Sequence, residues 1–176
     1  MSFVESRPLE AAAEATQETR NLLAQDLFTL MLREMFEFGL MQTDPNFANY
    51  RYAPDSDQIV LLDYGACREI NPEIARKYRS LLAAGLEGRH DDVADHAIAL
   101  GFWSAETAPA HQAQLMKMMR MGFEGIAAVD TYDFADKTVS RQLHAEGVTL
   151  ANSGFVPPPV PIDVLFLQRK FGGIFL

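Results

Sequence analysis

The sequence predicts a mainly helical chain with one small β-hairpin, and three observations lead to that prediction. Apolar residues recur with helical spacing over most of the 176 residues. Two short strand-like segments stand on either side of a Pro-Asp-Ser-Asp turn at 54–57. Apolar residues make up 48% of the chain and charged residues 22%, so there is enough apolar material to bury a sizeable core.

Helix boundaries can be placed from capping residues. The first helix is predicted over 16–38, because Thr16 is a good N-cap and Gly39 a good stop. The Asn-Pro-Glu run at 71–73 predicts the start of a second helix, which continues to Leu86. Further helices are predicted at 91–101, 109–128 and 162–176, with a polar connector of weaker helical pattern at 130–152.

The charge balance argues against several classes of function. Fifteen Lys and Arg against 24 Asp and Glu give a net charge of −9 and a pI near 4.8. A nucleic-acid binder would carry a basic stripe, and a protein bound to anionic lipid a polybasic patch, and neither is present. The single cysteine, Cys67, cannot form an internal disulfide, which favours a reducing compartment.

Two acidic residues and an asparagine flank the predicted hairpin. The two strands are predicted at 50–53 and 58–62. Asp44 lies five residues before Asn49, which directly precedes the first strand, and Asp63 directly follows the second. Because paired strands bring these ends together, we expect Asn49 and Asp63 to lie at one edge, with Asp44 on the preceding loop.

The residue types at this edge indicate phosphoryl transfer. Carboxylate and amide oxygens suit Mg²⁺, and a carboxylate that the metal does not need can accept a proton from a nucleophile. Kinase-like folds use a D-x-x-x-x-N loop and then a D-F-G-like tripeptide, as 44–49 and Asp63-Tyr64-Gly65 do here. The alternative is that both segments are ordinary turns.

The same segments resemble a known family, the UbiB/AarF atypical kinase-like proteins, in the branch tied to coenzyme Q (ubiquinone) biosynthesis. Residues 42–49 and 61–69 carry the resemblance. Segments 32–38, 156–159 and 168–173 fit the same branch. Carried over by position, the resemblance makes Asp44 the catalytic-loop aspartate, and Asn49 and Asp63 the Mg²⁺ ligands beneath ATP.

Three features qualify the resemblance. Gln42 stands where the broader family often has histidine, and Ala48 where it has glycine, but neither change removes a metal ligand. A helix starts at Asn71, only eight residues after Asp63, and no A-P-E-like signal follows. This leaves little room to dock a peptide, so protein kinase activity is not expected.

The family's fold implies that residues 1–176 form a protein-kinase-like C-terminal lobe. A hinge segment at 1–15, with its centre at 3–5, would lead into the catalytic loop, hairpin and metal-binding tripeptide at 41–65, and a helical subdomain would occupy 71–176. The family's N-terminal lobe has no counterpart in the sequence. We therefore expect a fragment that is inactive alone and belongs to an active ATPase.

The resemblance implies an ATPase that supports ubiquinone biosynthesis and uses ATP and Mg²⁺. Its expected partners are a lipid or quinone precursor and coenzyme Q biosynthesis proteins, without nucleic acid and with peripheral membrane association. The expected location is the bacterial cytoplasm or inner-membrane periphery, or the mitochondrial matrix face in a eukaryote.

Two alternatives stay open. The first is a small-molecule phosphotransferase of the aminoglycoside or choline kinase type, although such enzymes usually follow the metal aspartate with Trp or another acid rather than Tyr64-Gly65. The second is a non-catalytic helical module that binds a lipid or a partner protein. The alternatives differ in whether phosphate reaches a small molecule and in whether Asp44 and Asp63 matter at all.

Overall fold

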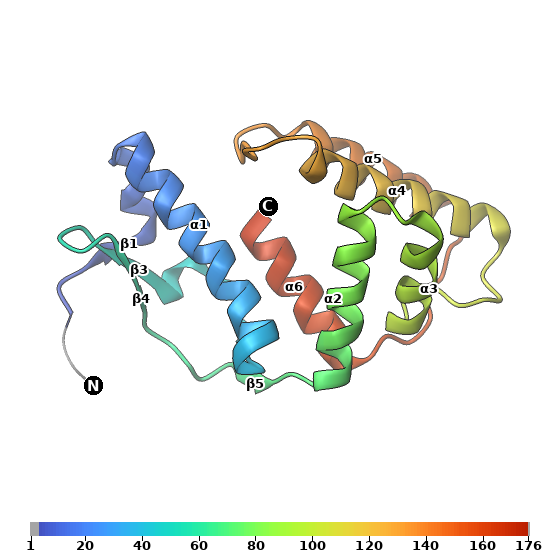
Figure 1. Cartoon of the computed structure of the whole chain (residues 1–176), viewed down its shortest axis with the longest axis horizontal. Coiled ribbons are helices and arrows are strands. Elements are labelled where there is room, and N and C mark those ends of the chain that lie inside the picture. The colour runs from blue at the N-terminus through green and yellow to red at the C-terminus, as the bar shows by residue number, and fades with distance from the viewer. Residues whose placement is uncertain (1–3, 176) are drawn as a thin grey trace. The chain divides into compact units, whose positions relative to one another are not determined.

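A computed structural model describes residues 4–175 of the chain, which divide into two compact units (Figure 1). The first unit combines the residues up to Pro72 with those from Phe166 onward, and the second comprises Glu73–Leu165. Of the expected hinge at 3–5, Phe3 lies outside the described residues, while Val4 and Glu5 have no regular secondary structure.

The predicted first helix is confirmed. Helix α1 spans Gln17–Arg33 and continues as a π-helical turn over Glu34–Phe38. The Thr16 hydroxyl accepts a hydrogen bond from the backbone N–H of Thr19 at 3.2 Å, as an N-cap should. Gly39 ends the helix at φ +63°, a left-handed conformation that glycine adopts without strain.

The hairpin is also confirmed, but it belongs to a larger sheet. Strands β1 (Arg7–Pro8), β3 (Tyr50–Ala53) and β4 (Gln58–Leu61) form an antiparallel sheet in the order β1-β3-β4. Strands β2 (Leu40–Gln42) and β5 (Cys67–Glu69) form a second pair. The sequence did not predict β1, β2 or β5, because strands of two or three residues are too short to show alternation.

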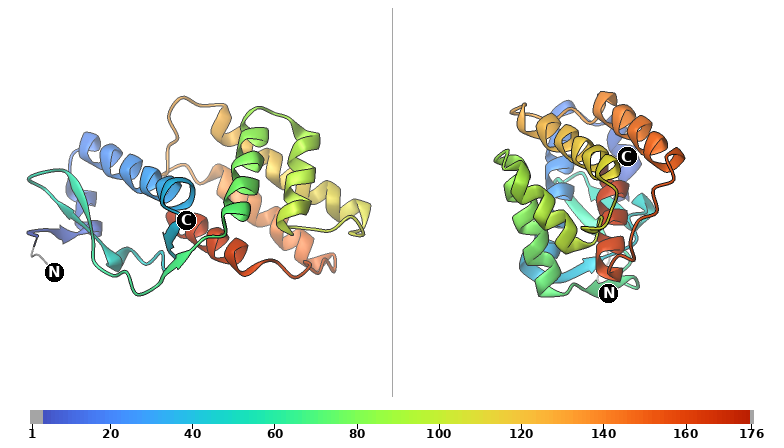
Figure 2. Two further views of the ribbon diagram at one scale, coloured as in Figure 1. Left: turned by 60° about the horizontal axis from the view of Figure 1, so that its bottom comes forward. Right: turned by 90° about the vertical axis from the view of Figure 1, so that its right-hand side faces the viewer.

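The core of the first unit lies between α1 and the sheets. Helix α1 contacts strand β4 (Figure 2). Leu23 of α1 packs with Tyr52 of β3 and with Ala12 of a 3₁₀-helix at Leu9–Glu14. Further along the chain Met31, Met35 and Met41 are fully buried, so the end of α1 and strand β2 are part of the core.

The second unit is helical. It contains α2 (Pro72–Leu86) from Glu73 onward, α3 (His90–Leu100), α4 (Pro109–Ala127) and α5 (Thr138–Asn152), and α4 and α5 lie side by side (Figures 1 and 2). The expected weak connector at 130–152 is wrong for most of its length, since α5 occupies it. Close packing explains this helix: a Cβ on Gly125 of α4 would lie 2.9 Å from the Val139 side chain of α5.

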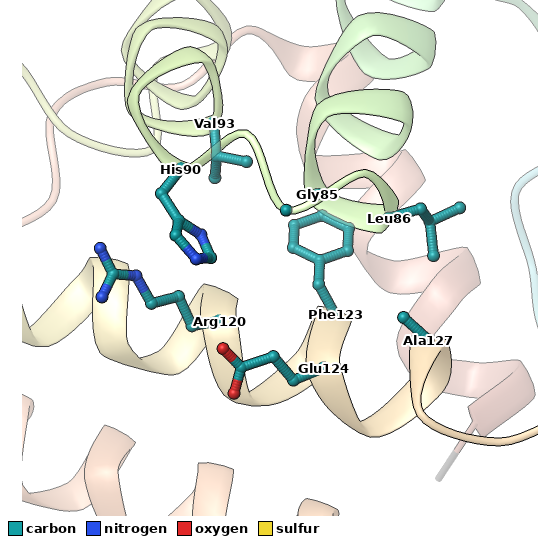
Figure 3. A pocket seen from close by; sticks show the side chains of 9 residues that line it. Gly85, Leu86, His90, Val93, Arg120, Phe123, Glu124 and Ala127 are labelled. Atoms are coloured by element: carbon teal, nitrogen blue, oxygen red, sulfur yellow. The ribbon is translucent and has the colours of Figure 1, made fainter.

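A small cavity of about 130 Å³ lies between α2, α3 and α4 (Figure 3). The Phe123 ring lies against Gly85, where an added Cβ would be 2.4 Å from the ring. His90, Arg120 and Glu124 also line the cavity. The cavity therefore depends on a glycine that lets α4 approach α2 closely.

Helix α6 (Ile162–Phe175) follows the predicted boundaries and contributes its residues from Phe166 onward to the first unit. Val164, Leu167 and Lys170 of α6 are buried. Among the helices that the structure describes, none combines the length and the apolar character that a membrane span requires.

Candidate active site

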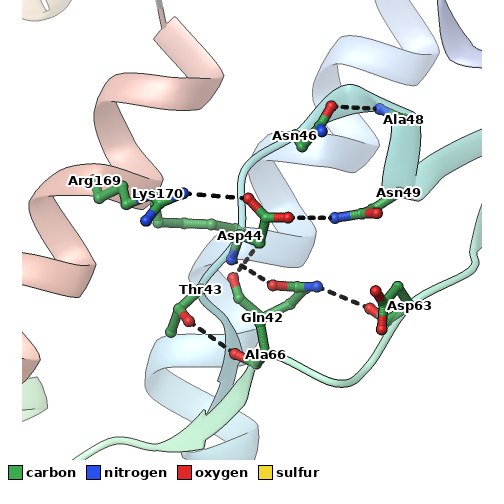
Figure 4. A network of polar contacts seen from close by, with 10 residues as sticks. All are labelled: Gln42, Thr43, Asp44, Asn46, Ala48, Asn49, Asp63, Ala66, Arg169 and Lys170. Atoms are coloured by element: carbon green, nitrogen blue, oxygen red, sulfur yellow. Dashed lines mark hydrogen bonds and ion pairs between the residues drawn. The ribbon is translucent and has the colours of Figure 1, made fainter.

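The candidate site lies in the first unit, on the loop between β2 and β3 and the segment after β4 (Figure 4). Asp44-Pro45-Asn46 begins the loop with turn-forming residues. The Asn46 side chain then accepts a hydrogen bond from the backbone N–H of Ala48 at 3.0 Å and caps a 3₁₀-turn at Phe47–Asn49. This local capping sets where Asn49 stands relative to Asp44.

Asp44 and Asn49 are in direct contact. The Asn49 side-chain amide donates to Asp44 Oδ2 at 3.0 Å. The other carboxylate oxygen, Oδ1, accepts from the exposed guanidinium of Arg169 at 3.3 Å. Asp44 is itself half-buried, so its carboxylate is oriented from two sides and remains open to solvent.

Asp63 stands at the same end of the hairpin as Asn49. The register pairs Tyr50 with Leu61, and the backbone N–H of Leu62 donates to the Asn49 carbonyl at 3.0 Å. Asp63 Oδ1 accepts from the N–H of Gly65 at 2.7 Å, which fixes the exposed carboxylate in a tight turn. The hairpin therefore brings the segments that carry Asn49 and Asp63 together, as the sequence predicted.

Gln42 joins the two acidic segments. Its side-chain oxygen accepts from the backbone N–H of Asp44, and its side-chain nitrogen donates to the Asp63 carbonyl at 2.8 Å (Figure 4). The neighbouring Thr43 adds two bonds to the Ala66 carbonyl, from its N–H at 3.1 Å and its hydroxyl at 2.8 Å. Gln42 and Thr43 are themselves buried, so these bonds are partly shielded from water.

A buried ion pair lies beneath Gln42. The Lys170 ammonium of α6 is 3.0 Å from Glu34 Oε2 and donates to the Gln42 carbonyl at 2.9 Å and the Tyr50 hydroxyl at 2.8 Å. Two of the three ammonium donors are thus hydrogen-bonded, and the carboxylate of Glu34 balances the buried charge. Burial raises the pKa of Glu34, and the neighbouring Lys170 opposes that rise.

Sequence reasoning missed the ion pair, although a signal for it exists. Lys170 follows Val164 and Leu167 at intervals of three, on the buried face of α6. Glu34 lies between Met31 and Met35 on the buried face of the first helix. A charged residue on each of two buried faces predicts that the two charges meet, because an unpaired buried charge is very costly.

The side-chain oxygens available as metal ligands suit Mg²⁺ bound together with a nucleotide. Asn49 Oδ1 and Asp63 Oδ2 accept no hydrogen bond from any residue that the structure describes. Between 4 and 175, no group of three or more His, Cys, Asp or Glu side chains could hold a metal alone. Mg²⁺ suits such a site because it takes one or two carboxylates and fills its other positions with phosphate oxygens and water.

The helical fold, the small sheets and the loop geometry define a protein-kinase-like C-terminal lobe. A family model described as the ABC1 atypical kinase-like domain matches residues 1–97. The chain therefore belongs to the ABC1 atypical kinase-like family, the UbiB/COQ8-type proteins, and the resemblance seen in the sequence is confirmed.

Three curated relatives are similar over nearly the whole chain. The mitochondrial atypical kinase COQ8 of Saccharomyces cerevisiae is 32% identical over 178 residues, covering 100% of this chain and 35% of the yeast protein. COQ8B of Rattus norvegicus is 35% identical, covering 96% and 32%, and COQ8B of Danio rerio is 32% identical, covering 100% and 28%. This chain spans about a third of the length of these relatives.

Proposed function

We propose that the chain is the C-terminal lobe of a kinase-like ATPase that supports ubiquinone (coenzyme Q) biosynthesis. The observation that carries the proposal is the convergence of Asp44, Asn49 and Asp63, with Gln42 bonded to both acidic segments. Family membership and the relatives named atypical kinase COQ8 support it. The domain division given above for 1–15, 41–65 and 71–176 is part of this proposal.

Each residue has a defined part. Asn49 and Asp63 would hold Mg²⁺ through their free side-chain oxygens, and the bound cation would neutralise charge on the phosphates of ATP. Asp44 would orient the attacking water and take up its proton as the new P–O bond forms and the bond from the γ-phosphorus to the leaving ADP oxygen breaks. Asn49 also donates to Asp44 Oδ2, so the same side chain links the metal position to the base.

The molecule whose handling is coupled to ATP hydrolysis is proposed to be small or lipidic rather than a peptide. Eight residues lie between Asp63 and the start of α2 at Pro72, and part of them forms β5, which pairs back onto β2. A peptide substrate needs a longer platform after the metal aspartate. We therefore propose ATP hydrolysis coupled to the handling of a lipid or quinone precursor, together with other coenzyme Q biosynthesis proteins, through peripheral contact with a membrane.

The proposed location follows from the relatives. Those in yeast and rat carry the word mitochondrial in their names. The matching location for this chain is the matrix face of the inner membrane in a eukaryote, or the cytoplasm and inner-membrane periphery in a bacterium.

Calorimetric titration of the full-length protein with ATP, with and without Mg²⁺, tests the assignment. Binding should require Mg²⁺, and Asp63→Asn should weaken it by at least about 100-fold, since it removes a charged ligand. Asp95→Asn, on the exposed face of α3, is the matched control and should bind as the wild type does. Unchanged affinity in Asp63→Asn would reject the metal assignment.

Product analysis separates the remaining alternatives. An ATPase releases inorganic phosphate, whereas a small-molecule phosphotransferase moves the phosphoryl group to a hydroxyl of an added substrate in a one-to-one ratio. A non-catalytic module would tolerate replacement of both Asp44 and Asp63 by alanine without loss of function in a complementation assay.

A further inference from the structure

We infer that Lys170 is a positioning residue and that the end of α6 is the brace of the catalytic loop. The brace comprises Arg169, Lys170 and Gly173, which contact the loop at 42–50. The role of the brace in positioning a Mg²⁺-nucleotide site rests on the function proposed above. Its existence as a local constraint can be tested without that function.

A single ammonium closes the loop at its base. Lys170 donates to the Gln42 carbonyl and to the Tyr50 hydroxyl, at 2.9 and 2.8 Å. Gln42 lies two residues before Asp44, and Tyr50 lies directly after Asn49. The two ends of the Asp44–Asn49 segment are therefore held by one buried group, which is only 1% exposed.

The ion pair also holds Gln42, the residue whose side chain links the Asp44 and Asp63 segments. Lys170 lies 3.0 Å from Glu34 Oε2 and donates to the carbonyl of Gln42 at 2.9 Å. The backbone of Gln42 is thus held at its carbonyl by an ammonium that Glu34 pairs with. Its side chain, directed by that backbone, contacts the N–H of Asp44 and the carbonyl of Asp63.

Other contacts of α6 reach the loop or anchor the helix. A Cβ on Gly173 would lie 2.3 Å from Pro45 Cβ, so the helix and the loop approach as closely as glycine allows. Arg169 reaches Asp44 Oδ1. Four residues before Lys170, the Phe166 ring lies under the Arg68 guanidinium at 4.7 Å, which anchors α6 to β5.

The chemistry of the pair favours positioning over stability as its role. Replacing a buried ion pair by hydrophobic residues of similar size often leaves stability unchanged or improved, whereas removing one partner is strongly destabilising. The double variant Glu34→Leu/Lys170→Met should therefore unfold at a temperature near that of the wild type. It should nevertheless lose the bonds that close the loop.

Hydrogen exchange of the full-length protein measures loop closure directly. In the double variant, amides at 43–50 and 63–66 should exchange about tenfold faster or more, as loss of hydrogen bonds to a charged group implies. Tyr50→Phe removes only one acceptor and should give a smaller increase in the same segments. Lys117→Met, which breaks an exposed ion pair with Glu146, is the matched control and should leave these segments unchanged.

Exchange unchanged at 43–50 in both the double variant and Tyr50→Phe would overturn the inference. An increase spread evenly over α1 and the sheets would also overturn it, because it would mean a general loss of stability. Confinement to the loop and the Asp63 segment supports the brace.

Nucleotide binding separates this inference from the proposed function. If the wild type binds Mg²⁺-ATP, the double variant should bind about 10- to 100-fold more weakly although its stability is kept. Affinity and stability that both match the wild type would reject the positioning role. If the wild type binds no Mg²⁺-ATP while exchange changes as predicted, the brace stands and the proposed function fails.

Discussion

Asn49 donates its side-chain amide to Asp44 Oδ2 across 3.0 Å. Because the nitrogen is committed to this bond, the side-chain oxygen of Asn49 is directed away from Asp44, and no described residue donates to it. The hydrogen-bond network fixes this orientation of the amide. The side-chain nitrogen of Asn49 therefore binds the Asp44 carboxylate, and its side-chain oxygen is left for a cation.

Asn49→Ala should weaken Mg²⁺-dependent nucleotide binding by about 10- to 100-fold, because it removes both a metal oxygen and the partner of Asp44. Calorimetric titration of the full-length protein with Mg²⁺-ADP measures the change. Asn152→Ala, at the exposed end of α5, is a matched control that should bind normally. Equal affinities for the two variants would contradict the role given to Asn49.

Gly173→Ala should destabilise the first unit, since the new methyl group would overlap Pro45. Overpacking of this kind costs about 1–3 kcal/mol, of which the better helix propensity of alanine returns up to about 1 kcal/mol. Urea denaturation followed by circular dichroism gives the difference. In the control, Gly122→Ala of α4, nothing lies within 4 Å of the new atom, so stability should rise.

Alkaline pH should destabilise the second unit through Tyr78 of α2. Its phenol is buried against Phe102, and burial raises its pKa well above the ordinary value of 10.0. Above pH 10 the unfolded chain releases a proton that the folded chain keeps. The free energy of unfolding therefore falls as pH rises, by up to about 1.4 kcal/mol per pH unit from this group.

Denaturation at pH 9 to 11, compared with that of Tyr78→Phe, isolates this contribution. The variant should lose part of the alkaline fall in stability, because phenylalanine has no proton to release. Parallel curves for the two proteins would mean that Tyr78 titrates alike in the folded and unfolded states.

The sequence predicted those parts of the fold that have local signals. Thr16 and Gly39 mark the first helix because capping depends on neighbouring residues alone. The hairpin followed from strand-like segments around a turn. Helix α5 was missed because its formation depends on close packing against α4, which propensity does not report.

The sequence predicted the motif of the candidate site but not the contacts of Lys170 that hold the loop in place. Asp44, Asn49 and Asp63 follow a spacing that can be read directly from the chain. Lys170 lies 120 residues or more from the groups that it bonds in the loop. Only the packing of α6 brings it there, and the signal in the sequence is a charged residue on each of two buried helix faces, Lys170 and Glu34.

The most direct test of the account is to locate the cation. Mn²⁺ prefers the same oxygen ligands as Mg²⁺ and broadens nuclear magnetic resonance signals of groups near it. Added with ADP to the full-length protein, it should broaden the side-chain amide of Asn49 and the backbone signals of Asp63 and Gly65 first. Broadening that begins elsewhere, or none at these residues at saturating nucleotide, would contradict the assignment of this loop as a magnesium-nucleotide site.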